Sequence, residues 1–208
     1  MKLTDRTLTE LLAAFRSSEP TPGGGSASAL SGAVGASLLA MVARLPRPQG
    51  ATTEDIERLA TAGGRCAALS EQLATLVDRD SDAYDLVVTA YRLPRHTEEE
   101  KRTRQGAIQA AMRAATDAPL DVMRACSAAI ELGAVVAAFG NRSASSDLLV
   151  GLELLGAGLR GARLNVDINL ATLQDAAYTE SARHETDRLA ASAESGIAAA
   201  RAAVASTA

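Results

Sequence analysis

The stretch LSEQLATLVDRDSDAYDLVVTAY (residues 69–91) decides the fold, because its apolar side chains recur at helical spacing. Steps of three or four residues relate Leu69, Leu73, Leu76, Asp80, Tyr84, Val87 and Tyr91. The series extends back three residues to Cys66 and seven more to Leu59. Such spacing places these side chains on one face of a helix. Thr53 precedes acidic residues suited to a helix start, and Pro94 ends the pattern. The sequence therefore predicts a helix of many turns with one buried seam.

Asp80 interrupts this apolar seam. It occupies a position between Leu76 and Tyr84 where an apolar residue is expected. A buried carboxylate must find a partner or shift its pKa. Two interpretations stay open, a structural carboxylate that pairs with an Arg or caps a helix, and a functional acid. Asp82 and Asp85 lie on other faces of the helix, where solvent is expected.

The rest of the chain also reads as helix. A stripe from Leu8 to Phe15 follows Thr4, a predicted N-cap. The glycines at 23–25 end that helix and begin another, which runs to about Leu45, before Pro46 and Pro48.

Thr97 and Glu100 have capping-box spacing, which predicts the start of a further helix. Pro119 is expected to kink this helix or restart it behind Asp117.

Gly140 and Asn141 break the helical pattern again, and Ser143 or Ser145 is expected to cap the next helix. A final Ala-rich helix is predicted over 177–205. No segment alternates like a strand. We predict an all-α fold, one domain over residues 1–208, built as a bundle of long antiparallel helices.

Composition narrows the classes of function. Hydrophobic residues make up 47% and aromatic residues 2%, so the core is built from small and aliphatic side chains. The net charge is −4 and the basic residues are scattered, which argues against nucleic-acid binding. The N-terminus lacks signal-peptide features, which predicts a cytoplasmic protein. The apolar tract from Ala27 to Leu45 contains serines and glycines, so we expect a buried core helix and no membrane span.

The reactive side chains are few. Cys66 and Cys126 have no motif spacing, so no disulfide is predicted. His96 and His184 belong to no ligand-spaced cluster, so no metal site is predicted.

Three further polar positions are candidates for a site. Asp147 lies in the first turn of a predicted helix. Either its charge stabilises the helix dipole, or the preceding turn places its carboxylate in a cleft. Asn165 and Asn169 are one turn apart among apolar residues, so each amide needs a neighbouring helix or a ligand as its partner.

The stretch TPGGGSASA (residues 21–29) resembles a phosphate loop only superficially. It has no following Lys and it follows a helical pattern, which excludes a Walker loop and a dinucleotide fingerprint. Two interpretations remain: a helix N-terminus with accessible N–H groups that receives an anion or a carbonyl, and a tight turn with close helix packing.

Five segments together resemble one known family. They are PTPGGGSASALSGAVGASLLAMVARL, LATLVDRDSDAYDLVVTAYRLPRHTEEEK, APLDV, GNRSASSDLLVG and LNVDINLATLQDAAY, in that order over about residues 8–178. The chain is similar to the cyclodeaminase domain of formiminotransferase-cyclodeaminase, in a family that also includes bacterial methenyltetrahydrofolate cyclohydrolases.

The resemblance implies a homodimeric all-α bundle that binds a tetrahydrofolate derivative between helices and needs no cofactor beyond that substrate. A separate formiminotransferase is an implied partner. Cyclodeaminases convert 5-formimidoyl-tetrahydrofolate to the 5,10-methenyl form and ammonia. Cyclohydrolases add water to the methenyl form to give 10-formyl-tetrahydrofolate. Both reactions need protons moved at nitrogen, which a positioned carboxylate can do.

The resemblance also implies which residues form the site. Asp80 and Asp147 are the implied acids, one as acid/base and the other as pterin anchor. The implied binding residues are Gly23, Gly24, Gly25, Ser26, Arg95, Asn141, Asn165, Asn169 and Asp175.

Two departures from the family pattern matter. The segment PRPQGATTED (46–55) contains no Lys where the family usually has a basic tract. If that tract binds the glutamate tail of folate, we expect a changed tail affinity or polyglutamate preference here. Arg95 replaces the usual Lys, and Arg is a poor proton donor.

The sequence favours the cyclodeaminase, by the likeness of LATLVDRDSDAY and INLATLQDAAY. The alternatives are the cyclohydrolase and a folate-binding helical protein without turnover.

Overall fold

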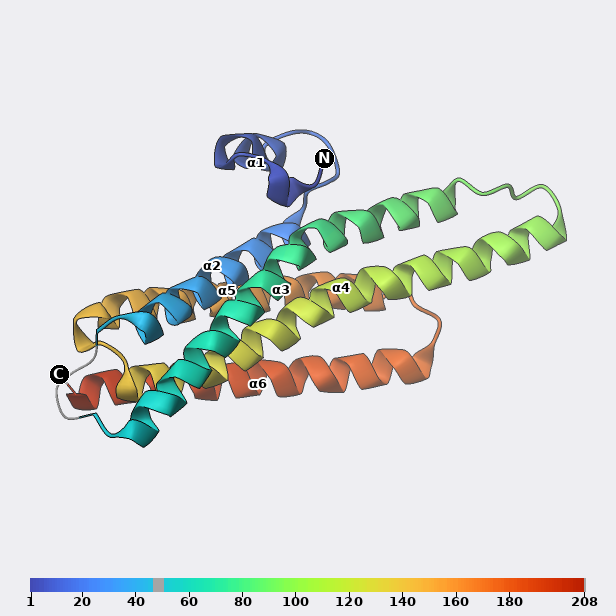
Figure 1. Cartoon of the computed structure of the whole chain (residues 1–208). Helices are drawn as coiled ribbons and strands as arrows, with labels where there is room; N and C mark the ends of the chain where they lie inside the picture. Colours follow the sequence, from blue (N-terminus) through green and yellow to red (C-terminus); the bar gives the residue numbers. More distant parts are fainter. Residues whose placement is uncertain (47–50, 208) are drawn as a thin grey trace.

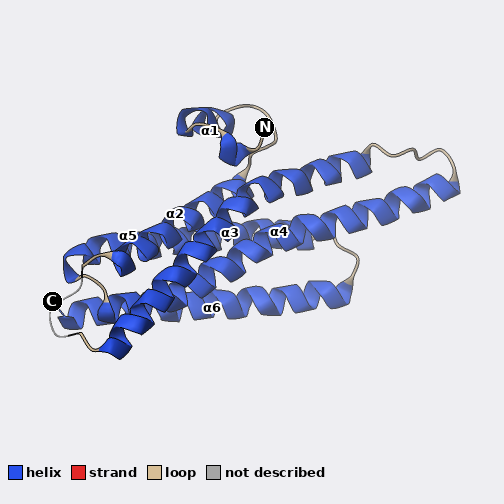
Figure 2. Ribbon diagram, viewed as in Figure 1, coloured by secondary structure: helices blue, strands red, loops and turns tan. Residues whose placement is uncertain are grey.

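The described residues, 1–46 and 51–207 of a computed structural model, form helices joined by turns (Figures 1 and 2). The α-helices are α1 (Leu8–Phe15), α2 (Gly24–Arg44), α3 (Thr53–Tyr91), α4 (Glu98–Phe139), α5 (Ser145–Leu170) and α6 (Ala176–Thr207). Short 3₁₀ helices cover Leu3–Asp5 and Arg142–Ala144. The predicted all-α bundle is confirmed. Pro48 and the middle of the PRPQGATTED segment lie outside the described residues.

Helix α2 is central to the bundle, packed between α3 and α5. It runs antiparallel to α5, because Gly24 faces Asn165 at one end and Gly35 faces Gly151 towards the other. Helices α3 and α4 form a long hairpin that extends beyond the other helices, and α6 lies along α4 (Figure 1). By length and composition α2 and α4 could cross a membrane. In the fold, 61% of the apolar window of α2 and 50% of that of α4 are buried, as expected for core helices.

Glycines let α2 and α5 approach closely. A Cβ added to Gly35 would lie 2.5 Å from the carbonyl oxygen of Gly151, and one on Gly158 would lie 2.7 Å from that of Ser28. These distances are shorter than any normal carbon–oxygen contact. Small residues therefore provide the tight helix packing that the low aromatic content predicted.

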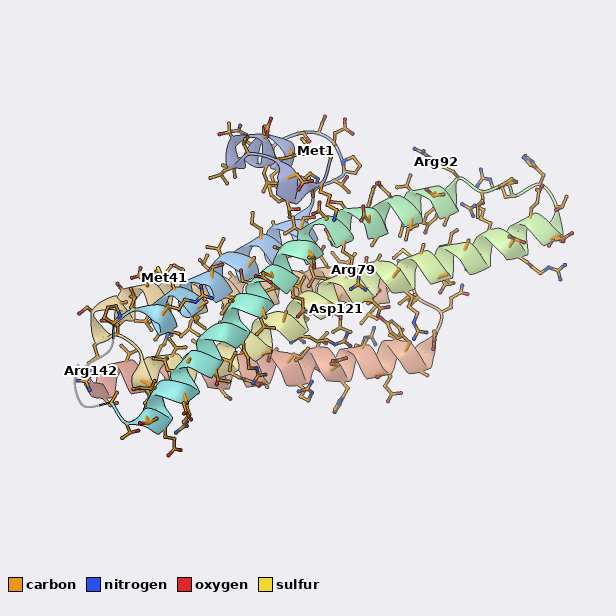
Figure 3. The ribbon with its side chains drawn as sticks, in the orientation of Figure 1. Met1, Met41, Arg79, Arg92, Asp121 and Arg142 are labelled. Atoms are coloured by element: carbon orange, nitrogen blue, oxygen red, sulfur yellow. The ribbon has the colours of Figure 1, made fainter. Side chains whose placement is uncertain are left out.

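An ion-pair network ties the outer side of the bundle together. Asp121 of α4 accepts from Arg79 of α3 at 2.6 Å and from Arg124 at 2.7 Å (Figure 3). Arg124 also pairs with Glu185 of α6 at 2.6 Å, and this guanidinium lowers the pKa of the Glu185 carboxyl. Three helices thus share one chain of charges.

Helix caps explain where most helices begin. Thr7, Thr52 and Thr97 each form a capping box with the acid three residues later. The prediction for Thr97 and Glu100 is confirmed. The prediction of Thr4 as N-cap is wrong, because its hydroxyl donates to Asp78 at 2.6 Å.

Helix α5 begins without a serine cap. Its N-cap is Ala144, and Ser145 is already its first residue, so neither predicted serine caps it. Asn141 caps the preceding 3₁₀ turn instead, accepting from the Ser143 N–H at 2.9 Å. A short turn therefore takes the place expected for the serine.

Pro119 lies inside α4, which is assigned as one continuous helix, so the prediction that it restarts the helix is wrong. Proline has no N–H, which leaves the carbonyl four residues earlier, at Ala115, without its helical donor. The side-chain amide of Asn169 donates to that carbonyl at 2.7 Å. An amide on α5 thus replaces the hydrogen bond that Pro119 removes from α4.

This compensation predicts coupling between Asn169 and Pro119. We expect Asn169→Ala to lower the free energy of unfolding by about 1–3 kcal/mol, because a partly buried carbonyl loses its donor. In a Pro119→Ala background the restored N–H supplies that donor, so the same change should cost about 1 kcal/mol less. A double-mutant cycle by urea unfolding at fixed protein concentration measures this coupling. Additive effects of the two substitutions would contradict the assignment.

Candidate active site

Asp80 of α3 meets the N-terminus of α2. Its Oδ2 accepts from the backbone N–H of Ser26 at 2.8 Å and from the Ser26 hydroxyl at 3.0 Å. That hydroxyl also lies 2.9 Å from the carbonyl of Val77 and 3.3 Å from the Ser81 hydroxyl. The carboxylate therefore occupies the positive end of a helix, the position that favours an anion.

Gly25 makes this approach possible. A Cβ on residue 25 would lie 2.5 Å from Asp80 Cγ and still closer to Oδ1. Any larger side chain therefore displaces the carboxylate. Gly23 is the N-cap of α2 and has no side-chain cap bond of its own, so Asp80 supplies the acceptor from a neighbouring helix.

Burial raises the pKa of the Asp80 carboxyl, and the two hydrogen bonds from Ser26 partly oppose this. No basic residue is among the causes that act on it. Of the two structural roles predicted for Asp80, the helix cap is confirmed, and no Arg pairs with Asp80 among residues 1–46 and 51–207. A half-buried carboxyl with a raised pKa is suited to taking and returning a proton closer to neutral pH.

Asn165 lies at the same end of α2. Its amide nitrogen would be 3.6 Å from a Cβ on Gly24, and it donates to the Gly161 carbonyl at 2.9 Å. Asn169 follows one turn later on α5, where its side-chain amide donates to the Ala115 carbonyl. The structure thus brings together Gly23, Gly24, Gly25, Ser26, Asp80 and Asn165, with Asn169 beside them.

Asp147 and Asn141 lie at the opposite end of the bundle. Asn141 donates to the carbonyl of Pro46, just beyond the C-terminus of α2, at 2.6 Å. Because α2 spans 21 residues at about 1.5 Å each, the two ends are about 30 Å apart. Figure 3 shows Arg142, next to Asn141, at the end far from Met1. Within one chain, Asp147 therefore does not meet Asp80.

Arg95 and Asp175 form no hydrogen bond or ion pair with the group around Asp80 among the described residues. Arg95 is exposed in the connection between α3 and α4, at the tip of the long hairpin. Asp175 precedes α6, where it accepts from the Tyr178 N–H at 3.0 Å and pairs with Arg113 at 3.4 Å. In one chain these two residues do not join the group around Asp80.

Sequence reasoning missed a second polar cluster. The Tyr178 hydroxyl donates to Asp117 of α4 at 2.7 Å, and the Arg113 guanidinium lies 4.3 Å from the centre of the tyrosine ring. Burial, and then Asp117, raises the pKa of Tyr178. The three-residue spacing between Asp175 and Tyr178 is the signal that could have found it.

The cysteines and metal-type ligands form no such site in residues 1–46 and 51–207. Cys66 and Cys126 are free and buried, and burial raises their pKa to about 11 and about 12. No cluster of three metal-ligating side chains occurs in the described part of the chain. Among the described residues, the group at the N-terminus of α2 therefore offers Asp80 as its acid/base candidate.

Comparison with known proteins agrees on one family. The family model described as formiminotransferase-cyclodeaminase matches residues 7–188. Methenyltetrahydrofolate cyclohydrolase of Methylorubrum extorquens is 39% identical over 189 residues, which cover 91% of each chain. Formimidoyltransferase-cyclodeaminase of Rattus norvegicus is 32% identical over 90% of this chain, which corresponds to 35% of the rat protein.

The fold has a solved counterpart. The crystal structure of formiminotetrahydrofolate cyclodeaminase from Thermotoga maritima superposes with a TM-score of 0.83 at 25% identity, over 97% of both chains. The matching motifs, the helical architecture and these relatives lead to one assignment. The chain belongs to the formiminotransferase-cyclodeaminase family.

Proposed function

We propose that the protein is a methenyltetrahydrofolate cyclohydrolase, which converts 5,10-methenyl-tetrahydrofolate and water to 10-formyl-tetrahydrofolate. The observation that carries this proposal is the 39% identity to a cyclohydrolase over 91% of both chains. The likeness to the rat bifunctional enzyme is 32% and covers about a third of that protein. The comparisons thus favour the cyclohydrolase over the cyclodeaminase that the sequence motifs had favoured.

Asp80 supplies the proton transfers in this proposal. Water adds to the methenyl carbon while the Asp80 carboxylate takes one of its protons. The C–N5 bond of the tetrahedral adduct then breaks, N5 takes the proton from Asp80, and the hydroxyl group loses its proton to solvent as the formyl C=O forms. The net change is one water added and one proton released. The raised pKa of Asp80 supports both directions of transfer.

The second candidate is the cyclodeaminase, favoured by the fold match to the Thermotoga maritima enzyme. The Asp80 carboxylate also moves the protons in this reaction. N10 attacks the carbon of the protonated formimidoyl group, Asp80 takes the N10 proton, and the departing NH2 group receives that proton and leaves as ammonia while the methenyl cation forms. Asp80 is therefore the proposed acid/base residue in either reaction.

We expect Asp80→Asn to lower turnover by about 100-fold or more, because the amide cannot accept a proton. The fold should persist, since the Asn oxygen still accepts from the Ser26 N–H. A raised pKa means that the ionised carboxylate costs stability above the folded-state pKa, so at pH 7 the variant should be no less stable. The rate at which the methenyl absorbance disappears measures turnover, and thermal unfolding measures stability.

The exposed Glu71→Gln, on α3 about two and a half turns before Asp80, is the comparison variant and should keep wild-type turnover. Full turnover in a folded Asp80→Asn variant would contradict the assignment. If the wild type instead forms methenyl absorbance from the formimidoyl substrate, the cyclodeaminase is correct. Tight folate binding with neither reaction would identify a binding protein without turnover.

The proposed enzyme acts as a homodimer joined through an apolar face of α2 and α5. This α2–α5 face consists of Val34, Met41, Val150, Leu164 and Ile168, which are 39–70% exposed. Figure 3 shows Met41 on the outer side of α2. Exposed apolar patches of this kind mark interaction sites. A face about 30 Å long and two helices wide covers about 600 Å² per chain, or about 1,200 Å² in a dimer, enough for a specific interface.

A two-fold axis across the middle of this face gives Asp147 a role. The axis reverses the direction of both helices, so the Asp147 end of one chain lies against the glycine-turn end of its partner. Each site then combines Asp80 of one chain with Asp147 of the other. In the single chain Asp147 forms no side-chain hydrogen bond or ion pair among the described residues, which leaves its carboxylate available for such a role.

Mixing two inactive variants tests this composite site. We expect Asp147→Asn to be as inactive as Asp80→Asn when each is assayed alone. After the two are unfolded and refolded together, half of the dimers are mixed, and each mixed dimer has one intact site of two. Activity should therefore return to about a quarter of the wild-type value.

Wild type carried through the same refolding is the control. No recovery from mixed dimers shown to form by mass spectrometry would contradict the composite site. Full activity of Asp147→Asn alone would remove Asp147 from the reaction.

A further inference from the structure

A pocket of about 390 Å³ lies between the N-terminal segment and the outer face of α3. Its charged lining residues are Lys2, Arg6, Asp78, Asp82 and Asp85, and Thr21, Pro22 and Ser81 complete the side nearest α2. The size is that of a small-molecule site. In Figure 3, the segment that carries Met1 lies outside the bundle, above the region where the start of α2 meets α3.

Asp78 fixes the segment that carries the cations. Its two oxygens accept from the Leu3 N–H at 2.5 Å and from the Thr4 hydroxyl at 2.6 Å. Leu3 is buried in the main core, 7% exposed. The backbone that positions Lys2 and Arg6 is therefore anchored to α3 by both hydrogen bonds and packing.

Arg6 is the unusual residue in this pocket. Its side chain is half-buried, and its Nε has neither solvent contact nor a hydrogen-bond partner among the described residues. It forms no ion pair in the described chain, although three carboxylates line the same pocket. A guanidinium without an acceptor is matched by a carboxylate, which can take two parallel N–H bonds.

The pocket adjoins the proposed reaction site. Ser81 lines the pocket, and its hydroxyl lies 3.3 Å from that of Ser26, which in turn donates to Asp80. Pro22 lines the pocket and directly precedes the glycine turn. A ligand whose reacting carbon lies near Asp80 can therefore extend a charged tail past the glycine turn towards Arg6.

We propose that this pocket binds the carboxylates of the substrate's glutamate tail, with Arg6 as the main cation and Lys2 as the second. The proposal rests on the proposed function, since it assumes a folate substrate. Asp82 and Asp85 repel the tail, so they limit its affinity.

The test compares 5,10-methenyl-tetrahydrofolate with 5,10-methenyl-tetrahydropteroate, which lacks the glutamate. We expect Arg6→Gln to raise KM for the folate by about tenfold with kcat unchanged, because one charge-assisted contact is lost. KM for the pteroate should not change. Asp82→Asn should lower KM for the folate alone, because it removes a repulsive charge. Arg16→Gln, on the same segment but outside the pocket, is the matched control.

Equal effects of Arg6→Gln on both substrates, or no effect on either, would overturn the proposal. If Arg6→Gln does not fold, the effect of Asp82→Asn on KM for the folate tests the proposal instead. An unchanged or higher KM in Asp82→Asn would overturn the tail site. If the wild type turns over neither substrate, the proposed function fails. Calorimetry with tetrahydrofolate and tetrahydropteroate then tests the pocket by itself. A preference for the glutamylated ligand that Arg6→Gln removes supports the tail site, and no preference overturns it.

Discussion

The contact between the Asp80 carboxylate and the N-terminus of α2 is the constraint on which the site depends. It requires a helix that begins with bare backbone at Gly25, because any Cβ there would collide with the carboxylate. It also requires two donors from Ser26, which hold a half-buried acid that has no ion-pair partner within the described part of the chain. The helix end lowers the cost of the buried charge while burial raises the pKa. One contact thus positions the acid and adjusts its proton affinity.

The close packing of α2 on α5 fixes where this contact occurs. Gly35 and Gly158 bring the two backbones together, and the antiparallel register then places Asn165 beside Gly24. The same register separates Asp80 from Asp147 by the full length of α2. In the proposed dimer a two-fold partner brings Asp147 back to a site, and the exposed apolar side chains of the α2–α5 face form the surface proposed to bind that partner. The packing of α2 on α5 and the proposed dimer therefore together determine where Asp80 and Asp147 lie in the proposed site.

Much of this could be predicted from sequence where the signal is local. Helical spacing identified the buried seam in the first part of α3, up to Leu76, and singled out Asp80. The seam was wrong at the end of the helix, where Tyr84 and Tyr91 are exposed. Thr97 with Glu100 marked the start of α4. Long-range compensation was not predictable. From sequence, Pro119 was expected to kink or restart the helix. The residue that replaces its missing donor, Asn169, is 50 residues away on another helix and could not be identified from sequence. The sequence placed Asp147 and Asp80 in one site, because motifs do not show how far apart antiparallel helices hold their residues. Arg6 has no pattern around it, and only the fold of the N-terminal segment places it in a pocket.

The turnover of Gly25→Ala tests the role of the Asp80 contact most directly. The added methyl group must displace the carboxylate, and a misplacement of about 1 Å at a reacting group can cost about 100-fold in rate. We expect a loss of about that size in a folded variant. Gly64→Ala on α3, where an added Cβ meets nothing within 4 Å, should keep wild-type turnover. Wild-type turnover in a folded Gly25→Ala variant would show that the reaction does not depend on Asp80 at the N-terminus of α2.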